Sequence, residues 1–234
     1  MVRRAGSHRP PTFARLLGSW PVWLIALGFM LLAGLAGLAD GTLLAWDLPL
    51  RDLIEGLFQG AGLEEFLRQI GKLGSRELIG LLTIPAAWIA WSRCRQLAYV
   101  LVGAFAAAFA LEVVLKATIA RPRPPPGIGF GDSFPSGHVL AAAAFWGLMP
   151  AWVYLVTGRR WAWAAALVGT GVILLGVGVS RVFLGAHWPS DVVGGYLGGA
   201  IFLLIAEWMI HRPVLRCTEC PLHPIRHPRV PVRQ

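Results

Sequence analysis

Six apolar runs limit what this 234-residue chain can fold into more than any other feature. An α-helix needs about 20 mostly apolar residues to cross the roughly 30 Å hydrocarbon core of a bilayer. The runs cover residues 20–39, 77–91, 97–116, 139–156, 161–179 and 192–210. The second run is short for a span and contains Pro85. The pattern predicts an all-α fold, an integral membrane bundle of six transmembrane helices.

The composition also indicates a membrane setting. Hydrophobic residues make up 56% of the chain and charged residues only 14%, which leaves too little polar material to cover a water-soluble globule. The first run is longer than the apolar stretch of about 7 to 15 residues in a cleaved signal peptide. We therefore expect it to be a retained anchor.

Basic residues between the runs predict the orientation, because cytoplasmic loops are enriched in Lys and Arg. With the N-terminus inside, 13 of the 21 basic residues fall on the inner side. We therefore expect a multi-pass protein of the cell (inner) membrane with both termini cytoplasmic. Residues 1–19 form a basic cytoplasmic segment, 20–211 the membrane domain and 212–234 a basic, disordered cytoplasmic tail. The net charge of +9 fits anionic lipid headgroups, and no nucleic-acid recognition module is present.

The segment between the first two runs, residues 40–76, has an amphipathic pattern. Its apolar side chains recur at helical spacing, at Leu63, Phe66, Leu67, Ile70 and Leu73. The pattern predicts an interfacial amphipathic helix between spans 1 and 2. A helix packed on the protein's own loops is an equal alternative.

Three distant stretches bring polar residues to one outer membrane level in this topology. A single Lys, Arg or His at a span end is usually an interface anchor. Several together indicate function, because charges inside a membrane protein are costly. The residues are Lys116 and Arg123 after the third run, Ser136, Gly137 and His138 before the fourth, and Arg181, His187 and Asp191 between the fifth and sixth.

These residue types suit phosphate chemistry. Three cations beside a helix that starts at Ser136 form an anion site, with the amides of Gly137 and His138 free to bind the ligand. Of two histidines, one can attack phosphorus while the other protonates the leaving oxygen. Asp191 follows His187 by four residues and can orient that imidazole from the same helical face. Arg and Lys can neutralise the phosphoryl oxygens, so we expect no metal and no cofactor.

The same residues resemble the three-part signature of the type-2 phosphatidic acid phosphatase family. The matching parts are Lys116 with Arg123-Pro124, Pro135-Ser136-Gly137-His138, and Ser180-Arg181 with His187 and Asp191. The resemblance implies His187 as nucleophile, Asp191 as its orienting partner and His138 as general acid. It implies Lys116, Arg123, Ser136, Gly137 and Arg181 as the phosphate cradle. Soluble vanadate-dependent haloperoxidases share this site, but the apolar runs argue against them.

Arg121 falls outside the signature, and we expect it to contact a lipid headgroup at the membrane surface. This expectation follows from its place at the end of the third run, where a snorkelling arginine is common.

The expected activity is hydrolysis of a lipid phosphate or diphosphate through a phosphohistidine at the outer membrane face. Candidate substrates are undecaprenyl pyrophosphate, phosphatidic acid, phosphatidylglycerol phosphate and lipid A. One alternative is a lipid-to-lipid phosphotransferase that uses the same residues. Another is an inactive phospholipid-binding or transport protein, although the paired repeats of transporters are missing from the sequence.

The cysteines and the tail histidines allow a second interpretation. Cys217, Cys220, His223 and His227 have a spacing that could bind zinc, but nearby prolines in a short terminal segment favour a disordered tail. Cys94, near an inner loop, is expected to be an inert thiol.

Overall fold

The computed structural model describes residues 20–38, 45–60, 62–125 and 131–211. These residues form nine α-helices and no strand. The helices are α1 (Trp20–Leu38), α2 (Asp47–Phe58), α3 (Glu64–Lys72), α4 (Arg76–Trp91), α5 (Arg95–Ile119), α6 (Gly137–Trp146), α7 (Met149–Thr157), α8 (Arg160–Phe183) and α9 (Pro189–His211). The all-α prediction is therefore confirmed for the described residues.

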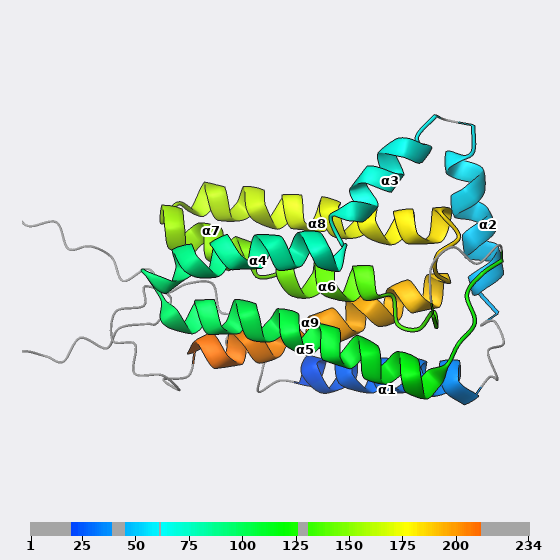
Figure 1. Ribbon diagram of the computed structural model, residues 1–234, viewed down its shortest axis with the longest axis horizontal. Helices are drawn as coiled ribbons and strands as arrows, with labels where there is room; N and C mark the ends of the chain where they lie inside the picture. Colours follow the sequence, from blue (N-terminus) through cyan, green and yellow to red (C-terminus); the bar gives the residue numbers. More distant parts are fainter. Residues whose placement is uncertain (1–19, 39–44, 61, 126–130, 212–234) are drawn as a thin grey trace, which may run out of the picture.

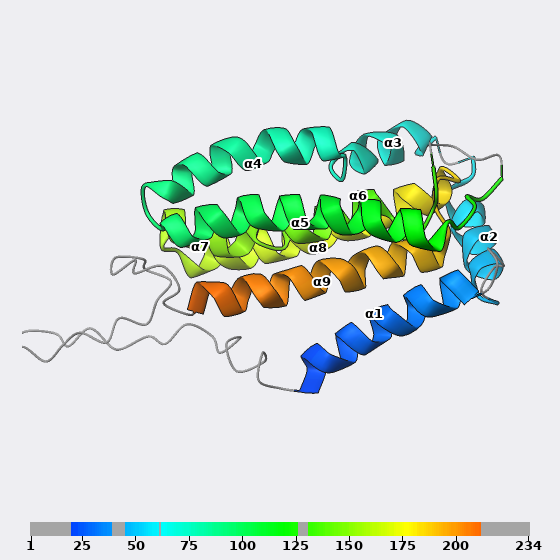
Figure 2. The same cartoon turned by 60° about the horizontal axis from the view of Figure 1, so that its bottom comes forward.

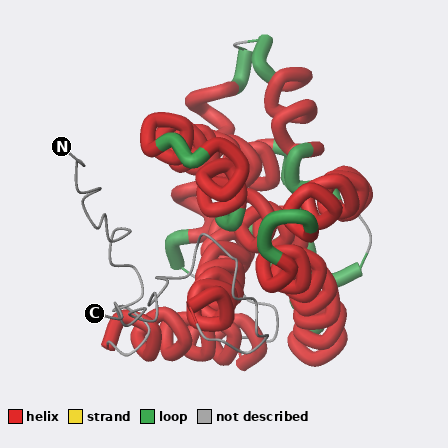
Figure 3. The backbone as a smooth tube through the Cα atoms, turned by 90° about the vertical axis from the view of Figure 1, so that its left-hand side faces the viewer, coloured by secondary structure: helices red, strands yellow, loops and turns green. Residues whose placement is uncertain are grey.

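The long helices lie side by side along the long axis of the molecule, whereas α2 and α3 lie at one end (Figures 1 and 2). Helix α6 packs against α9, α5 and α8, and α1 packs against α9. Figure 3 shows the bundle from the opposite end, where α4 turns into α5 and α7 into α8. Helices α5 and α8 end, and α6 and α9 begin, at the end that α2 covers.

Each of the six apolar runs coincides with a helix or, for the fourth run, with the pair α6 and α7. In the described residues, four segments are long and apolar enough to cross a membrane: Arg95–Ile119, Gly137–Thr157, Arg160–Phe183 and Pro189–Ala206. Helix α4 has 16 residues and α1 has 19. The number of six spans remains a prediction.

The break between α6 and α7 was not predicted. It falls at Gly147 and Leu148, where helix α9 comes very close. A Cβ atom on Gly147 would lie 2.5 Å from Leu203 Cδ1. The same Cβ would lie 2.6 Å from Ala143 O, a backbone atom that cannot shift as easily as a side chain, so packing favours glycine at this position.

Large apolar side chains face outward on the long helices. Ile84 and Trp88 on α4 are 69% and 81% exposed, and Val168 on α8 is 68% exposed. A belt of this kind is unfavourable in water and favourable in lipid. Inside the bundle, Ile79, Leu97, Val139 and Val177 are fully buried.

The segment between the first two runs forms two helices, α2 and α3. Helix α3 packs against α8: Leu67 is buried, and a Cβ on Gly176 would lie 2.6 Å from Ile70 Cγ2. Phe66 is 58% exposed. Packing on the protein itself, the alternative to an interfacial helix, is thus present, and a position in the membrane interface remains a prediction.

The expectation of a free thiol at Cys94 is wrong. Cys94 is buried at the start of α5 and is disulfide-bonded. The other two cysteines of the chain, Cys217 and Cys220, lie outside the described residues.

Candidate active site

Four helix termini deliver the predicted site residues to one end of the bundle. Lys116 lies in the last turn of α5 and Arg181 in the last turn of α8. Gly137 and His138 begin α6, and Asp191 lies in the first turn of α9. The convergence follows from the up-and-down order of the helices, because every second connection returns to the same end (Figure 1).

His187 lies at the centre of this end, in the turn between α8 and α9, and is 3% exposed. Its Nδ1 is 3.6 Å from Asp191 Oδ2, and its Nε2 is 3.4 Å from Arg123 Nη1. The first distance is longer than a hydrogen bond, and Nδ1 has no hydrogen-bond partner among the described residues. One nitrogen of the ring thus faces a carboxylate and the other faces a cation.

The environment of His187 favours the neutral imidazole. Burial lowers the pKa of His187 below its ordinary value, the nearby Asp191 carboxylate raises it in part, and the charges of Arg123 and Lys116 lower it again. A neutral imidazole has a lone pair with which it can attack an electrophile. His187 and Asp191 were expected on one face of a helix. That expectation is wrong, because α9 begins only at Pro189 and His187 lies in the turn before it.

Among the described residues, three backbone carbonyls accept hydrogen bonds from Arg123. It donates from Nη1 to Ala186 O at 2.6 Å, from Nε to Gly131 O at 2.9 Å and from Nη2 to Asp132 O at 3.3 Å. Burial lowers the pKa of Arg123, while Asp191, Glu112 and Asp132 raise it. A guanidinium remains charged at neutral pH even so. Arg123 is therefore a fixed cation beside Nε2 of His187.

The start of α6 is bound to α9 and α5. Ser136 N donates to Asp191 O at 3.0 Å. Ser136 is the N-cap residue, but its side chain makes no capping bond, and its buried Oγ has no partner among the described residues. A Cβ on Gly137 would lie 2.0 Å from Glu112 Oε1, so only glycine fits there without a shift.

Glu112 was missed by sequence reasoning, although it is one helical turn before Lys116. It is 3% exposed and accepts an ion pair from Lys116 Nζ at 2.8 Å. Arg76, at the start of α4, approaches the same carboxylate at 3.6 Å. An acidic residue four positions before a basic one on a helix is the signal that could have found this pair.

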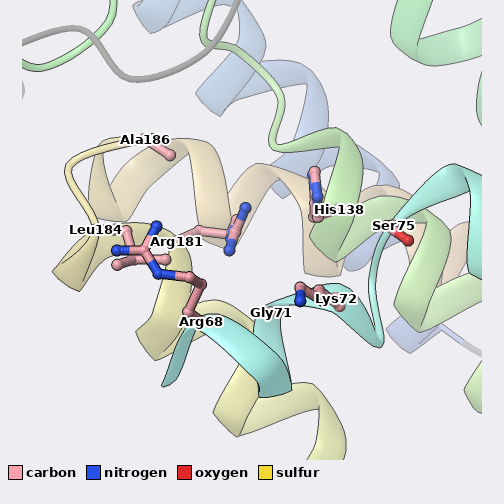
Figure 4. A pocket seen from close by; sticks show the side chains of 8 residues that line it. All are labelled: Arg68, Gly71, Lys72, Ser75, His138, Arg181, Leu184 and Ala186. Carbon is pink, nitrogen blue, oxygen red and sulfur yellow. The ribbon is translucent and has the colours of Figure 1, made fainter. Parts of the chain in front are cut away.

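A cavity of about 330 Å³ opens beside these residues (Figure 4). His138 and Arg181 line it from α6 and α8, and Arg68, Gly71 and Lys72 line it from α3. A Cβ on Gly71 would lie 2.1 Å from Arg181 Nη2. Helix α3 therefore forms a wall of the cavity, in close contact with one of the predicted phosphate ligands.

The expected role of Arg121 as a headgroup contact is wrong. Arg121 is fully buried and donates to Asp191 Oδ1 at 2.6 Å and to Asp47 Oδ2 at 2.7 Å. A left-handed Ala120, with φ of 49°, ends α5 and turns the chain just before Arg121. The charges at Asp47 and Arg121 are 74 residues apart in the sequence, so no local pattern could have paired them.

No group of three or more His, Cys, Asp or Glu side chains within the described ranges is suited to hold a metal ion. The possible zinc ligands Cys217, Cys220, His223 and His227 lie outside those ranges.

Comparison with known proteins identifies the family. Residues 96–213, half of the chain, match the model described as PAP2 superfamily. A phosphatidylglycerophosphatase B from Bacillus subtilis is 32% identical over 153 residues, which cover 61% of this chain and 73% of the relative. An undecaprenyl-diphosphatase from Sulfolobus acidocaldarius is 28% identical over 190 residues, which cover 76% and 85%.

A solved structure agrees with the fold. A transmembrane PAP2-type phosphatidylglycerolphosphate phosphatase from Bacillus subtilis aligns with a TM-score of 0.66 at 24% identity, over 80% of this chain and 94% of the other. The family match includes all eight predicted site residues. The chain therefore belongs to the PAP2 superfamily and is a membrane lipid phosphatase of that type.

Proposed function

We propose that the protein hydrolyses the phosphate or diphosphate headgroup of a membrane lipid through a phosphohistidine on His187. The observation that carries the proposal is the setting of that ring, with Nδ1 towards Asp191 and Nε2 towards Arg123. An anionic phosphate that binds Arg123 would replace the contact between Arg123 Nη1 and Nε2 and place its phosphorus next to Nε2, the nitrogen that attacks.

In the first step Nε2 of His187 forms a bond to the terminal phosphorus while the bond from that phosphorus to the leaving oxygen breaks. The leaving oxygen is the lipid ester oxygen in a phosphate headgroup and the bridging oxygen in a diphosphate headgroup. His138, at the edge of the cavity, donates a proton to that oxygen. Asp191 stabilises the positive charge that develops on the imidazole. Lys116, Arg123, Ser136, the Gly137 amide and Arg181 bind the phosphoryl oxygens.

In the second step a water molecule attacks phosphorus, and the bond to Nε2 breaks. His138, now neutral, takes the proton from the water, and inorganic phosphate leaves. The pair of steps regenerates the enzyme and consumes one water for each inorganic phosphate released. No part of the cycle uses a metal ion, so EDTA should leave the rate unchanged.

The substrate is proposed to be a lipid that enters from the bilayer at this end of the bundle. The names of the relatives support undecaprenyl diphosphate and phosphatidylglycerol phosphate among the four candidates. We also propose that the site faces the exterior or periplasm and both termini the cytoplasm, since the basic residues favour that orientation. Residues 20–211 are proposed to be the six-span membrane phosphatase domain.

The test is phosphate release by detergent-solubilised protein from undecaprenyl pyrophosphate, phosphatidic acid, phosphatidylglycerol phosphate and lipid A. Each lipid is assayed with and without EDTA and beside His187→Ala. Release from at least one lipid, lost in His187→Ala and insensitive to EDTA, is expected. A radiolabelled headgroup should also leave acid-labile label on the native protein and none on the variant.

Other results would point elsewhere. Full activity of His187→Ala would overturn the phosphohistidine, and loss of activity in EDTA would favour a metal mechanism. Release that requires a second lipid as acceptor would indicate the phosphotransferase. Lipid binding without turnover would indicate a binding or transport protein.

A further inference from the structure

A buried network of charges includes Asp191, and none of its residues lines the cavity. Asp47, Arg121, Ser190 and Asp191 are all 0% exposed. Charges removed from water in this way cost several kcal/mol each unless they are paired and hydrogen-bonded. Each of the four side chains is hydrogen-bonded to another member of the network, although Arg121 Nε has no partner among the described residues.

Arg121 is the centre of the network. Its Nη1 donates to Asp191 Oδ1 at 2.6 Å and to Ser190 Oγ at 2.6 Å, and its Nη2 donates to Asp47 Oδ2 at 2.7 Å. The planar guanidinium thus bridges two carboxylates in a fixed fork. Its place is set by the left-handed turn at Ala120, which ends α5 directly before it.

Asp47, at the first turn of α2, closes the network from a distant part of the chain. Its Oδ1 accepts from Ser190 N at 2.8 Å, and its Oδ2 accepts from Ser190 Oγ at 2.8 Å. Asp47 thereby binds both the backbone at the start of α9 and the guanidinium of Arg121. The position in the first turn of a helix is also favourable for a carboxylate.

The consequence is that both oxygens of Asp191 are fixed. Arg121 holds Oδ1, and Trp188 N donates to Oδ2 at 2.8 Å. Oδ2 is also the oxygen that faces His187 Nδ1 at 3.6 Å. Without Arg121, Oδ1 would lose its charged partner, and the bond from Trp188 N to Oδ2 alone would hold the carboxylate less rigidly against the imidazole.

We propose that Asp47 and Arg121 are positioning residues for catalysis: Asp47 orients Arg121, and Arg121 orients the Asp191 carboxylate against His187. The proposal rests on the proposed role of His187 as nucleophile. It extends the catalytic apparatus to α2, which lies outside the residues matched by the family model.

A purely structural role is the competing explanation, because the same bonds tie α2 to the start of α9. The structural role and the positioning role predict different changes in kcat, KM and the amount of folded protein. A loose structure impairs binding and turnover together, or lowers the amount of folded protein. A misoriented Asp191 lowers kcat with little effect on KM, because the phosphate cradle is intact.

The experiment measures kcat, KM, inhibition by inorganic phosphate and thermal unfolding in detergent for Asp47→Asn, Arg121→Gln, Arg121→Lys and the double variant Asp47→Asn with Arg121→Gln. The assay uses the lipid of the panel with the highest rate. Thr170→Val is the matched control. It removes the hydrogen bond that the buried Thr170, on α8, donates to Trp146 O at the end of α6. Thr170 lies eleven residues, or about 16 Å along the helix, before Arg181.

We expect kcat of Asp47→Asn and Arg121→Gln to fall about 10- to 100-fold, the range for outer partners that orient a site ligand. KM and phosphate inhibition should stay within about threefold, and Arg121→Lys should recover part of kcat. The double variant should lose no more than Arg121→Gln alone, because Asp47 acts through Arg121. Thr170→Val should keep native kcat even if its melting temperature falls as far as those of the Asp47 and Arg121 variants.

Arg121→Gln leaves two buried carboxylates without their cation and could fail to fold. Asp47→Asn and the double variant each remove the Asp47 carboxylate, so they leave less unpaired charge in the interior. They therefore test the proposal even if Arg121→Gln does not fold. Native kcat in folded Asp47→Asn and in the double variant would overturn the proposal. So would parallel changes in kcat and KM that follow the loss of stability.

Failure of the proposed function has a separate signature. In that case His187→Ala keeps its activity, whatever the Asp47 and Arg121 variants do. The positioning proposal alone fails when His187→Ala is inactive while the Asp47 and Arg121 variants turn over at the native rate.

Discussion

Helices α5–α9 and helices α1–α3 contribute to the candidate site in different ways. All eight residues of the predicted cradle and catalytic group lie on α5–α9 or on the connections between them. Helices α1–α3 supply none of them. Yet α2 provides Asp47, which holds Arg121, and α3 provides Gly71, which lies against Arg181.

The difference separates chemistry from support. Residues that would touch the phosphate come in short motifs, because a helix terminus presents several side chains and amides at one place. Residues that hold those side chains come from anywhere the fold brings them. The comparison predicts that substitutions of the first group nearly abolish phosphate release, whereas substitutions of the second group lower it by smaller and differing amounts.

Asp191→Asn should show the largest effect of the variants that sharpen this comparison. The amide keeps the shape of the carboxylate but cannot stabilise the imidazolium, and comparable losses in other His-Asp pairs reach about 10⁴-fold in kcat. Phosphate release should therefore fall by at least about 10³-fold. The melting temperature should fall too, because the buried Arg121 loses one of its two carboxylates, so the rate is measured on folded protein. A loss of less than tenfold would place Asp191 among the supports.

Gly71→Ala should have an intermediate effect. The new methyl group would lie 2.1 Å from Arg181 Nη2 and 2.5 Å from Ser180 Oγ, so the Arg181 side chain must move. Loss of one charge-assisted contact with phosphate, about 1.4 kcal/mol, should raise KM about tenfold. The KM is measured from the rate of phosphate release at increasing lipid concentration.

Gly103→Ala is the matched control for Gly71→Ala, since no atom lies within 4 Å of its new methyl group. If both variants show the native KM, Arg181 can move without cost and α3 has no part in the site.

The pH dependence should show a smaller but specific effect. Because burial lowers the pKa of His187, the neutral ring should persist below pH 6.5, and kcat/KM should decline only as the pH falls through that lowered pKa. In Asp191→Asn the decline should move to still lower pH, because Asp191 raises the pKa of His187. An acidic limb that is identical in both proteins would belong to the substrate or another group.

Ala120→Gly should have the smallest effect. A left-handed alanine costs about 1 to 2 kcal/mol, and the greater chain entropy of glycine offsets about 0.5 to 1 kcal/mol of the relief. The free energy of unfolding of the variant should be about 0.5 to 1 kcal/mol higher than that of the native protein, and kcat should be unchanged. A drop in kcat would show that a more flexible backbone at position 120 disturbs the placement of Arg121.

The helices and the convergence of the signature were predictable from the sequence. Apolar runs long enough for a span fix where helices form, and alternate connections must return to one end. The fold adds the pairing of Lys116 with Glu112, which a four-residue spacing could have indicated. The orientation in the membrane and the number of spans remain predictions.

The supports were not predictable, for a physical reason. An arginine at the end of an apolar run snorkels more often than it is buried, so Arg121 was assigned to the surface. Its burial depends on Asp47 and Asp191, 74 and 70 residues away. Likewise, the contact between Gly71 and Arg181 joins α3 to α8 and leaves no trace in either local pattern.

The place of Asp47 has a consequence for recombination between relatives. A chimaera that joins residues 96–213 to the amino-terminal half of another protein would inherit every motif of the signature and none of α2. If that half has no carboxylate at the place of Asp47, Arg121 would meet one carboxylate where it now meets two, in a site closed to water. Exchange of this half between homologues is therefore constrained by a single acidic residue that the motifs do not contain.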